Sequence, residues 1–214
     1  MAAIPDRLTV VDHPLIQDRL AVLRDVETPS NRFRHLVKQL TILEGAEATR
    51  DMSLSDIDVR TAVSMAHCKT LAHHKVSIIA VLRAGIGMLD GMLELLPNAH
   101  VGFLGMFRDQ ETHQPVEYYD KLPMDIAQHD HVYIVDPMLA TGGTAVRTLS
   151  VLRERGVRHI KLVVLIAAPE GVRAVLDADP EVQIYTCALD SGLNADDYIV
   201  PGLGDAGDRI FETL

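Results

Sequence analysis

The chain alternates short, almost continuously apolar runs with segments of helical periodicity, and this alternation constrains the fold more than any other feature. Because the apolar runs lack strict polar alternation, they are typical of strands that are buried on both faces of a parallel sheet. Such strands, separated by helices, predict an α/β fold in which helices flank a twisted parallel sheet. The strands are expected at residues 76–82, 101–107, 132–135, 162–168 and 182–188, and the intervening helices at residues 87–96, 143–154 and 170–178.

The first third of the chain is expected to form a helical extension of this core. The second of its two helices should begin with Ser30 or Asn31 as the N-cap residue. Later in the chain, Gly156 is expected to stop the helix over residues 143–154. Since no repeat, linker or low-complexity segment is present, we expect a single domain over residues 1–214. The apolar helix positions are Leu15, Leu20 and Leu23 for the first helix and Phe33, Leu36, Val37, Leu40 and Leu43 for the second.

The composition narrows the classes of protein that this chain can belong to. Hydrophobic residues make up 48% of the 214 residues and charged residues 23%, which is typical of a globular protein. No apolar stretch of about twenty residues and no secretory leader pattern occurs, so we expect a cytoplasmic protein without a membrane partner. A net charge of −10 argues against a nucleic-acid partner.

Neither the cysteines nor the histidines predict a metal site. Cys68 and Cys187 lack metal-ligand spacing and are expected to be packing residues, because a disulfide is uncommon in the cytoplasm. The ten histidines likewise show no ligand spacing, so we interpret them as surface or core residues.

Residues 132–144 combine an apolar strand, an acidic corner, a Thr-Gly-Gly-Thr turn and the start of a helix. Glycines let backbone N–H groups approach an anion, threonine hydroxyls add donors, and a helix N-terminus carries a partial positive charge. Asp136 adds an acceptor for ribose hydroxyls or an anchor for Mg²⁺-bound water. This segment therefore predicts a site for a phosphorylated sugar; an ordinary threonine-capped corner is the alternative. The chain contains neither the nucleoside-triphosphatase loop nor the dinucleotide fingerprint.

Two further segments place arginine directly after an apolar strand. Arg83 precedes a Gly-containing helix start, where its planar guanidinium is suited to a pyrophosphate; a surface arginine is the alternative interpretation. Arg108 opens a long polar segment, residues 107–123, that we interpret as a mobile hairpin arm able to close over a site. A solvated hairpin without a function is the alternative.

The segment over residues 198–209 concentrates three glycines and a proline. Such a backbone is irregular and largely free of side chains, so its peptide groups can read the donors and acceptors of a flat pyrimidine. Uracil fits N–H groups facing its two carbonyls, whereas the amine of cytosine would face a donor. Without further information, the segment could also be a simple turn.

The strings over residues 136–144 and 198–208 closely resemble those of the uracil phosphoribosyltransferases, a branch of the type I phosphoribosyltransferase superfamily. Pro137 stands where the wider superfamily has a second acidic residue, which narrows the resemblance to this branch. The similarity extends over nearly the whole chain; residues 61–76 are less typical. It implies the type I phosphoribosyltransferase fold and transfer of phosphoribose from 5-phospho-α-D-ribose 1-diphosphate to uracil, giving UMP and diphosphate in pyrimidine salvage.

The resemblance also implies roles for individual residues. Catalysis is assigned to Asp136, Arg108 and Asp205, and a non-proline cis peptide is expected within residues 81–90. Tyr118, Tyr119 and Lys121 match the hood of the arm, although Asp120 replaces an expected asparagine. Uracil contacts are assigned to Ile199, Gly204, Asp205 and Ala206. Contacts to phosphoribosyl diphosphate are assigned to Arg83, Arg108, Asp136, Pro137, Met138, Leu139, Ala140, Thr141, Gly142, Gly143, Thr144 and Asp205.

Other members of the family imply further properties. Mg²⁺ is expected to bind together with phosphoribosyl diphosphate, and the protein is expected to form a homo-oligomer, either a dimer or a tetramer. Some members respond to GTP, so GTP is a candidate effector. Two alternatives remain at this point: a nucleotide-sensing regulator that binds RNA or DNA, and a transferase for another base such as a purine.

Overall fold

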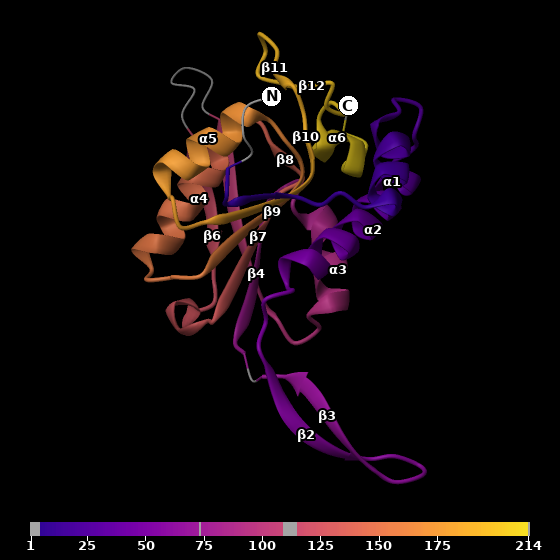
Figure 1. The fold of residues 1–214 in the computed structure, drawn as a ribbon. Helices are drawn as coiled ribbons and strands as arrows, with labels where there is room; N and C mark the ends of the chain where they lie inside the picture. Colours follow the sequence, from indigo (N-terminus) through magenta and orange to yellow (C-terminus); the bar gives the residue numbers. More distant parts are fainter. Residues whose placement is uncertain (1–4, 73, 109–114, 214) are drawn as a thin grey trace.

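The computed structural model describes residues 5–72, 74–108 and 115–213, and its centre is a mostly parallel sheet (Figure 1). The strand order is β1-β10-β9-β7-β4-β5-β6, with β8 paired to β9 beyond the end of β7. The strands are β1 (Leu8–Val10), β4 (Val76–Leu82), β5 (His100–Arg108), β6 (Pro115–Lys121), β7 (His131–Val135), β8 (Met138–Leu139), β9 (Ile160–Ala167) and β10 (Gln183–Leu189).

Helices cover both faces of this sheet, as the sequence predicts (Figure 1). On one face lie α1, α2, α3 and α6, and on the other lie α4 and α5. A short 3-10 turn, η1 (Ile126–Gln128), precedes β7. The helices are α1 (Pro14–Arg24), α2 (Ser30–Ala48), α3 (Ile86–Leu95), α4 (Gly143–Glu154), α5 (Pro169–Ala178) and α6 (Ala206–Phe211).

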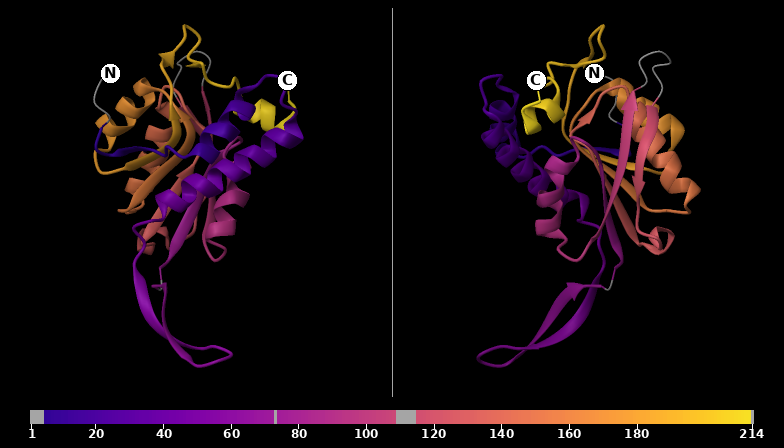
Figure 2. Two further views of the ribbon diagram at one scale, coloured as in Figure 1. Left: turned by 45° about the vertical axis from the view of Figure 1, so that its right-hand side comes forward. Right: turned by 180° about the vertical axis from the view of Figure 1, so that it is seen from behind.

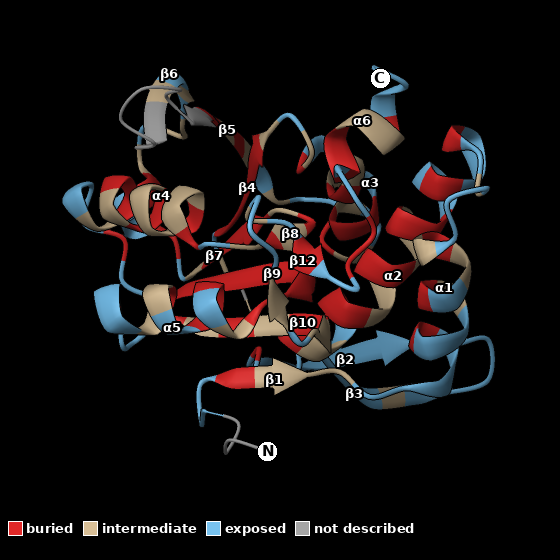
Figure 3. Ribbon diagram, turned by 90° about the horizontal axis from the view of Figure 1, so that it is seen from above, coloured by how far each residue is buried: buried red, intermediate tan, exposed pale blue. Residues whose placement is uncertain are grey.

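The central strands contribute alternate side chains to two separate cores, which explains their unbroken apolar runs. Ile78 and Ala80 of β4 pack in the core with α2 and α3, whereas Ile79 and Val81 pack in the core with α4 and α5. All four side chains are at most 3% exposed. Figure 3 shows the same burial along β7 and β9. A strand buried on both faces needs apolar residues at every position, so the interpretation of the runs is confirmed.

The order of the strands creates a switch point between β4 and β7. From β4 the chain passes through α3 to β5 on one side, and then returns to β7 on the other side. Beyond β7 the chain continues outward through β9 to β10. Ligands of open α/β sheets bind where the strand order reverses, outside the carboxyl ends of the strands. Residues 83–85 and 136–144 follow the two strands at this point.

The predicted arm is partly incorporated into the sheet. Within residues 107–123, β6 pairs antiparallel with β5, so the sheet is mixed at this edge rather than entirely parallel. β6 is tied to α4 by the ion pair between Arg147 and Glu117 at 3.6 Å and by another between Arg155 and Asp120. Residues 109–114 of the predicted arm lie outside the described residues.

A second hairpin, β2 (Leu54–Arg60) with β3 (Met65–Leu71), extends away from the sheet and was not predicted (Figure 2). Cys68 lies on β3 and is exposed, so its prediction as a packing residue is wrong. The reason is that the hairpin has no core to cover it. Cys187, on β10, is buried as expected, and both thiols are free.

The N-terminal helices are confirmed, but the start of α2 differs from the prediction. Pro29 is the N-cap residue and Ser30 is already helical. The Ser30 hydroxyl instead donates to the carbonyl of Arg209 at 2.7 Å and fastens α2 to α6. Gly156 follows α4 with φ +83°, as predicted for a helix stop. Within the described ranges, every helix is too short or too polar to span a bilayer.

Glu44 of α2 is a titratable group enclosed in the core, and it was not predicted as a residue of interest. Glu44 is 0% exposed, and neither of its carboxyl oxygens makes a hydrogen bond of ordinary geometry within the described part of the chain. Burial raises the pKa of Glu44 well above its usual value, while the neighbouring Cys187 thiol has a smaller, opposing effect. Burial therefore favours the protonated carboxyl, because ionisation here would strand a charge.

Replacing Glu44 by the neutral Gln should flatten the dependence of stability on pH above about 4.5. A raised folded-state pKa means that the native protein holds a proton that the unfolded chain loses near pH 4.5. Stability therefore falls as the pH rises from that value toward the folded-state pKa, and Glu44→Gln should remove this fall. Urea midpoints measured between about pH 5 and about pH 9 test it.

Glu47→Gln on the same helix is the matched control. The hydrogen bond from Arg50 lowers the pKa of Glu47, so this variant should lose stability at neutral pH. Parallel pH profiles for Glu44→Gln and the unmodified protein would contradict the assignment of a buried proton.

Candidate functional site

The turn after β7 forms a small cavity at the carboxyl edge of the sheet. β7 ends at Val135, Asp136 follows, and α4 begins at Gly143. The cavity has a volume of about 100 Å³. Its wall includes all but one of the residues predicted for the phosphate loop: Asp136, Met138, Leu139, Ala140, Thr141, Gly142, Gly143 and Thr144; Pro137 is buried beside it.

Gly142 and Gly143 serve this turn in different ways. Gly142 has φ +85°, and a Cβ there would lie 2.9 Å from the carbonyl oxygen of Gly171. At Gly143, by contrast, a Cβ would meet only the Thr141 hydroxyl, at 3.9 Å. Packing within the described residues thus requires glycine at position 142, while the space at position 143 remains open to a ligand.

The amino end of α4 is available to bind an anion. Gly142 is its N-cap residue, and no side chain caps the first turn. The first amide groups of a helix have no intrahelical acceptor, and the helix dipole adds partial positive charge at this end. A phosphate group can accept hydrogen bonds from such amides.

Asp136 is partly exposed but has an unusual protonation equilibrium. Burial raises the pKa of Asp136 to about 7, and a hydrogen bond from the backbone amide of Met138 opposes this shift. The carboxyl therefore changes charge near neutral pH. Such a group can exchange a proton when a hydroxyl donor or a cation arrives.

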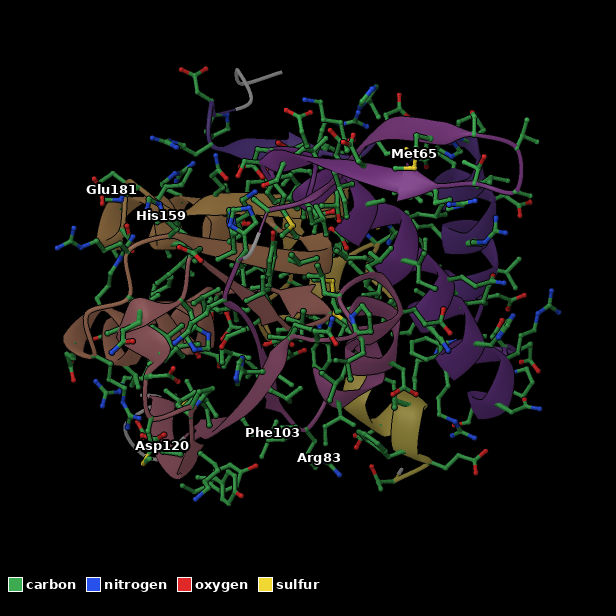
Figure 4. All side chains as sticks on the ribbon, turned by 90° about the horizontal axis from the view of Figure 1, so that it is seen from below. Met65, Arg83, Phe103, Asp120, His159 and Glu181 are labelled. Carbon is green, nitrogen blue, oxygen red and sulfur yellow. The ribbon has the colours of Figure 1, made fainter. Side chains whose placement is uncertain are left out.

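The turn after β4 links this cavity to the C-terminal part of the chain. A Cβ at Gly85 would lie 2.4 Å from the carbonyl oxygen of Val135, so the turn packs directly against the end of β7. The Arg83 side chain extends in the other direction and lies 3.1 Å from Asp208 of α6. Figure 4 shows Arg83 on the side of the molecule that carries α6. The predicted non-proline cis peptide is confirmed between Leu82 and Arg83.

Asp208 is the acidic partner of Arg83 and was not predicted. Hydrogen bonding to the Thr213 hydroxyl and to Arg83 lowers the pKa of Asp208, with Thr213 the larger cause. Arg83 is about half exposed, with 55% of its side chain accessible, so an anion can reach it and compete with Asp208.

The glycine-rich C-terminal loop borders a cavity of about 670 Å³. The loop leaves β12 (Ile199–Val200), which pairs with β11 (Gly192–Leu193), and turns at Gly202 and Gly204 with φ +59° and +82°. The Asp205 carboxylate accepts a hydrogen bond from the Asp208 amide at 2.9 Å and caps α6. Ile199 and Ala206 are buried, whereas Gly204 and Asp205 are exposed.

The fold therefore brings most of the predicted residues to one edge of the sheet. The turn over residues 83–85 packs against the end of β7, which leads into residues 136–144, and the Arg83 side chain reaches Asp208, just after the loop over residues 199–206. Arg108 ends β5 at the same edge, although its side chain lies outside the described atoms. Tyr118 and Tyr119 are exposed on β6, where Tyr119 faces Gly105 of β5.

Three residues that hydrogen-bond to the backbone of the C-terminal loop were not predicted from the sequence: Arg24, Asp190 and Arg209. Asp190 directly follows β10, as Asp136 follows β7, so its position after an apolar run was a usable signal. Arg24 and Arg209 carry no such signal, because Arg24 bonds to Asp190 and Gly202, and Arg209 to Asp25, all far away in the sequence.

Comparison with known proteins agrees with this geometry. A model of the family described as uracil phosphoribosyltransferase matches residues 10–213. The chain belongs to the uracil phosphoribosyltransferase family. A uracil phosphoribosyltransferase of Thermoanaerobacter sp. (strain X514) is 55% identical over 204 residues, covering 95% of this chain and 97% of that protein. Another from Agathobacter rectalis is 52% identical, covering 97% and 99%.

Solved structures support the fold. A protein from Aquifex aeolicus superposes with a TM-score of 0.89 at 36% identity, covering 96% of this chain and 98% of that one. A hypoxanthine-guanine phosphoribosyltransferase from Bacillus anthracis reaches a TM-score of 0.53 at 13% identity, covering 75% and 80%. The second comparison shows the shared phosphoribosyltransferase fold alone. The predicted fold and family are thus confirmed.

The different surroundings of the two glycines yield a test of the phosphate loop. Gly143→Ala should leave the fold intact, because the added methyl group meets no close atom of the protein. The methyl group should instead occupy space that the ligand needs, and KM for phosphoribosyl diphosphate should therefore rise by about tenfold or more. Steady-state kinetics and thermal unfolding measure the two effects.

Gly142→Ala is the paired control. It should lower stability by about 1 kcal/mol or more, because alanine is strained at φ +85° and contacts Gly171. Normal affinity in a fully folded Gly143→Ala protein would mean that this space does not receive the phosphate.

Proposed function

We propose that this protein transfers phosphoribose from 5-phospho-α-D-ribose 1-diphosphate to N1 of uracil, forming UMP and diphosphate for pyrimidine salvage. One observation carries the proposal beyond family membership. The phosphate-type turn at residues 136–144 and the bare-backbone loop at residues 199–206 occur at the same sheet edge, and the Arg83 side chain reaches Asp208, just after that loop. This arrangement is expected of a site that holds a sugar phosphate and a base together.

The 5′-phosphate is assigned to the backbone amides and hydroxyls of residues 140–144, and Asp136 is assigned to the ribose hydroxyls. Arg83 and Arg108 are assigned to the diphosphate, whose growing charge they would stabilise as it leaves. The exposed guanidinium of Arg83 supports this assignment, because the diphosphate can replace Asp208 as its partner. These local donors offset the net charge of −10, which would otherwise repel the substrate.

The residues present fit a Mg²⁺ ion that arrives with the substrate. Within the described ranges, no cluster of three or more His, Cys, Asp or Glu side chains could hold a metal. Mg²⁺ commonly binds through one or two carboxylates together with substrate oxygens and water, and Asp136 is the carboxylate placed for this. When bound, the ion would neutralise charge on the diphosphate.

Uracil is assigned to Ile199, Gly204, Asp205 and Ala206. The exposed backbone at Gly204 and Asp205 supports reading of the base by peptide groups. Cytosine would place its amine against a peptide donor, and such a mispaired polar group is rejected strongly. Because the Asp205 carboxylate already caps α6, its role in polarising the base would use its remaining acceptor capacity.

In this reaction the uracil N1 attacks the anomeric carbon from the face opposite the diphosphate, and the anomeric centre inverts. Breaking the C–O bond gives the ribose ring positive character, so the protein's contribution is positioning, charge stabilisation and exclusion of water. The arm over residues 107–123 is assigned to the last task, closing over the site with Tyr118, Tyr119 and Lys121 in its hood.

We further propose that the chain is a single domain that assembles into a dimer or tetramer in the cytoplasm. The β2–β3 hairpin supports assembly, because it exposes several large apolar side chains that a second copy could cover. GTP remains a predicted effector. The exposed apolar residues are Leu54, Ile57, Val59, Val63, Met65 and Leu71.

A product assay with a panel of bases tests the function directly. With phosphoribosyl diphosphate and Mg²⁺, the protein should convert uracil at least about 10³-fold more efficiently than cytosine, hypoxanthine or guanine. If the protein converts hypoxanthine or guanine more efficiently than uracil, the assignment of uracil as the substrate is wrong. Absence of any product, together with a gel shift of pyrimidine-operon RNA, would favour a regulator instead.

The pKa of Asp136 gives this activity a predicted pH dependence. Only the carboxylate accepts hydrogen bonds from two ribose hydroxyls, and its ionised fraction grows as the pH rises through about 7. Thus kcat/KM for phosphoribosyl diphosphate should rise between about pH 6 and about pH 8. Asp136→Asn should lower kcat/KM for phosphoribosyl diphosphate about 10- to 100-fold. It should also remove the part of the pH-dependent rise that comes from ionisation of Asp136.

Substrate ionisation persists in the Asp136→Asn profile and therefore serves as the internal reference. Identical pH profiles for the two proteins would exclude Asp136 as the titrating group.

A further inference from the structure

An ion pair behind the C-terminal loop joins three distant parts of the chain. Arg24, at the end of α1, donates to both carboxylate oxygens of Asp190, at 2.7 and 2.8 Å. The side chain of Asp190 is 5% exposed and that of Arg24 is 24% exposed. A bidentate pair that is largely shielded from water has a fixed geometry, unlike a solvated surface pair.

Both members of this pair also hold the peptide groups of Gly202. The Gly202 amide donates to the Asp190 carboxylate at 2.8 Å, and the Gly202 carbonyl accepts from Arg24 at 2.8 Å. Gly202 has φ +59°, and a Cβ there would lie 2.1 Å from the carbonyl oxygen of Ile199. The pair therefore fixes the turn of the loop at the residue where the backbone is most constrained.

The pair connects this turn to rigid elements on either side. The Asp190 amide donates to the carbonyl of Ala167, at the end of β9 in the sheet, at 2.9 Å. Arg209 adds a parallel contact, since it donates to the carbonyl of Leu203 at 2.9 Å. Gly202 stands between Ile199 and Gly204, so its orientation sets the spacing of the two backbone segments assigned to uracil.

We propose that Arg24 and Asp190 are positioning residues that set base affinity and base discrimination by orienting the uracil loop through Gly202. The proposal rests on the function proposed above. Neither side chain need touch the base. If the pair is lost, the Gly202 peptide loses a donor and an acceptor at once, and the peptide groups facing the base lose their fixed geometry. Within the described residues, the phosphate loop over residues 136–144 makes no hydrogen bond or ion pair with Arg24 or Asp190 and should keep its own geometry.

Kinetics of Arg24→Gln and Asp190→Asn test the proposal. Each should raise KM for uracil by about 10- to 100-fold, and should lower the ratio of kcat/KM for uracil to that for cytosine. KM for phosphoribosyl diphosphate should change by less than about threefold, because the change is confined to the base site. Arg24→Lys keeps the charge but not the bidentate guanidinium, so its KM for uracil should lie between those of the unmodified protein and Arg24→Gln.

The chain offers a matched control in a second Arg–Asp pair. Arg153 donates to both oxygens of Asp179, at 2.7 and 3.0 Å, with side chains 27% and 10% exposed. This pair lies at the end of α4 and does not contact the uracil loop. Arg153→Gln should lower the unfolding temperature as Arg24→Gln does, but should leave KM for uracil and base discrimination unchanged.

The double variant Arg24→Gln/Asp190→Asn decides whether the residues act as one unit. If they do, the double variant should raise KM for uracil little more than either single variant. All assays are run at a temperature where circular dichroism shows that each protein is folded. If Arg24→Gln or Asp190→Asn does not fold, the more conservative Arg24→Lys supplies the test.

Three outcomes would overturn the assignment. These are an unchanged KM for uracil in folded Arg24→Lys and Arg24→Gln, an equal rise in KM for both substrates, or the same effect in Arg153→Gln. Failure of the proposed function itself is distinct, because the unmodified protein would then not convert uracil.

Discussion

The pairing of β4 with β7 is the constraint on which the candidate site depends. Ala80 of β4 lies opposite Val135 of β7 in a parallel register, so both strands run toward the same edge. Arg83 and Asp136 follow within a few residues of these positions, and the sheet order reverses between the two strands. The backbone hydrogen bonds of two buried strands therefore place a guanidinium and a carboxylate at the same edge, because parallel strands end together.

The site must bind a polyanion although the protein carries a net charge of −10. Local groups resolve this conflict. The amino end of α4 presents backbone amides, and the half-exposed Arg83 follows β4 at the same edge of the sheet. Asp136 has a pKa of about 7, so this carboxyl is partly neutral before a ligand arrives, which reduces repulsion. Charge attraction within a few ångströms outweighs a diffuse field that salt screens.

Several features were predictable because local sequence patterns produce them. Strands buried on both faces, such as β4 and β9, need unbroken apolar runs, and these were located to within two residues. The turn at Gly142 was also visible, since φ +85° there demands glycine. By contrast, β1, β11 and β12 have two or three residues each and exist only because a partner strand is present. Periodicity cannot reveal elements of that length.

Local sequence patterns specify the α/β class, the order of its main elements and the segments that carry the phosphate-type and glycine-rich turns. They do so because burial on two faces and positive φ angles restrict which residues are allowed. Tertiary packing sets what surrounds those turns: the Arg83–Asp208 contact, the raised pKa of Asp136 and the Arg24–Asp190 support of Gly202. The Arg83–Asp208 and Arg24–Asp190 contacts join residues more than a hundred positions apart, and their energies depend on burial, which local sequence does not specify.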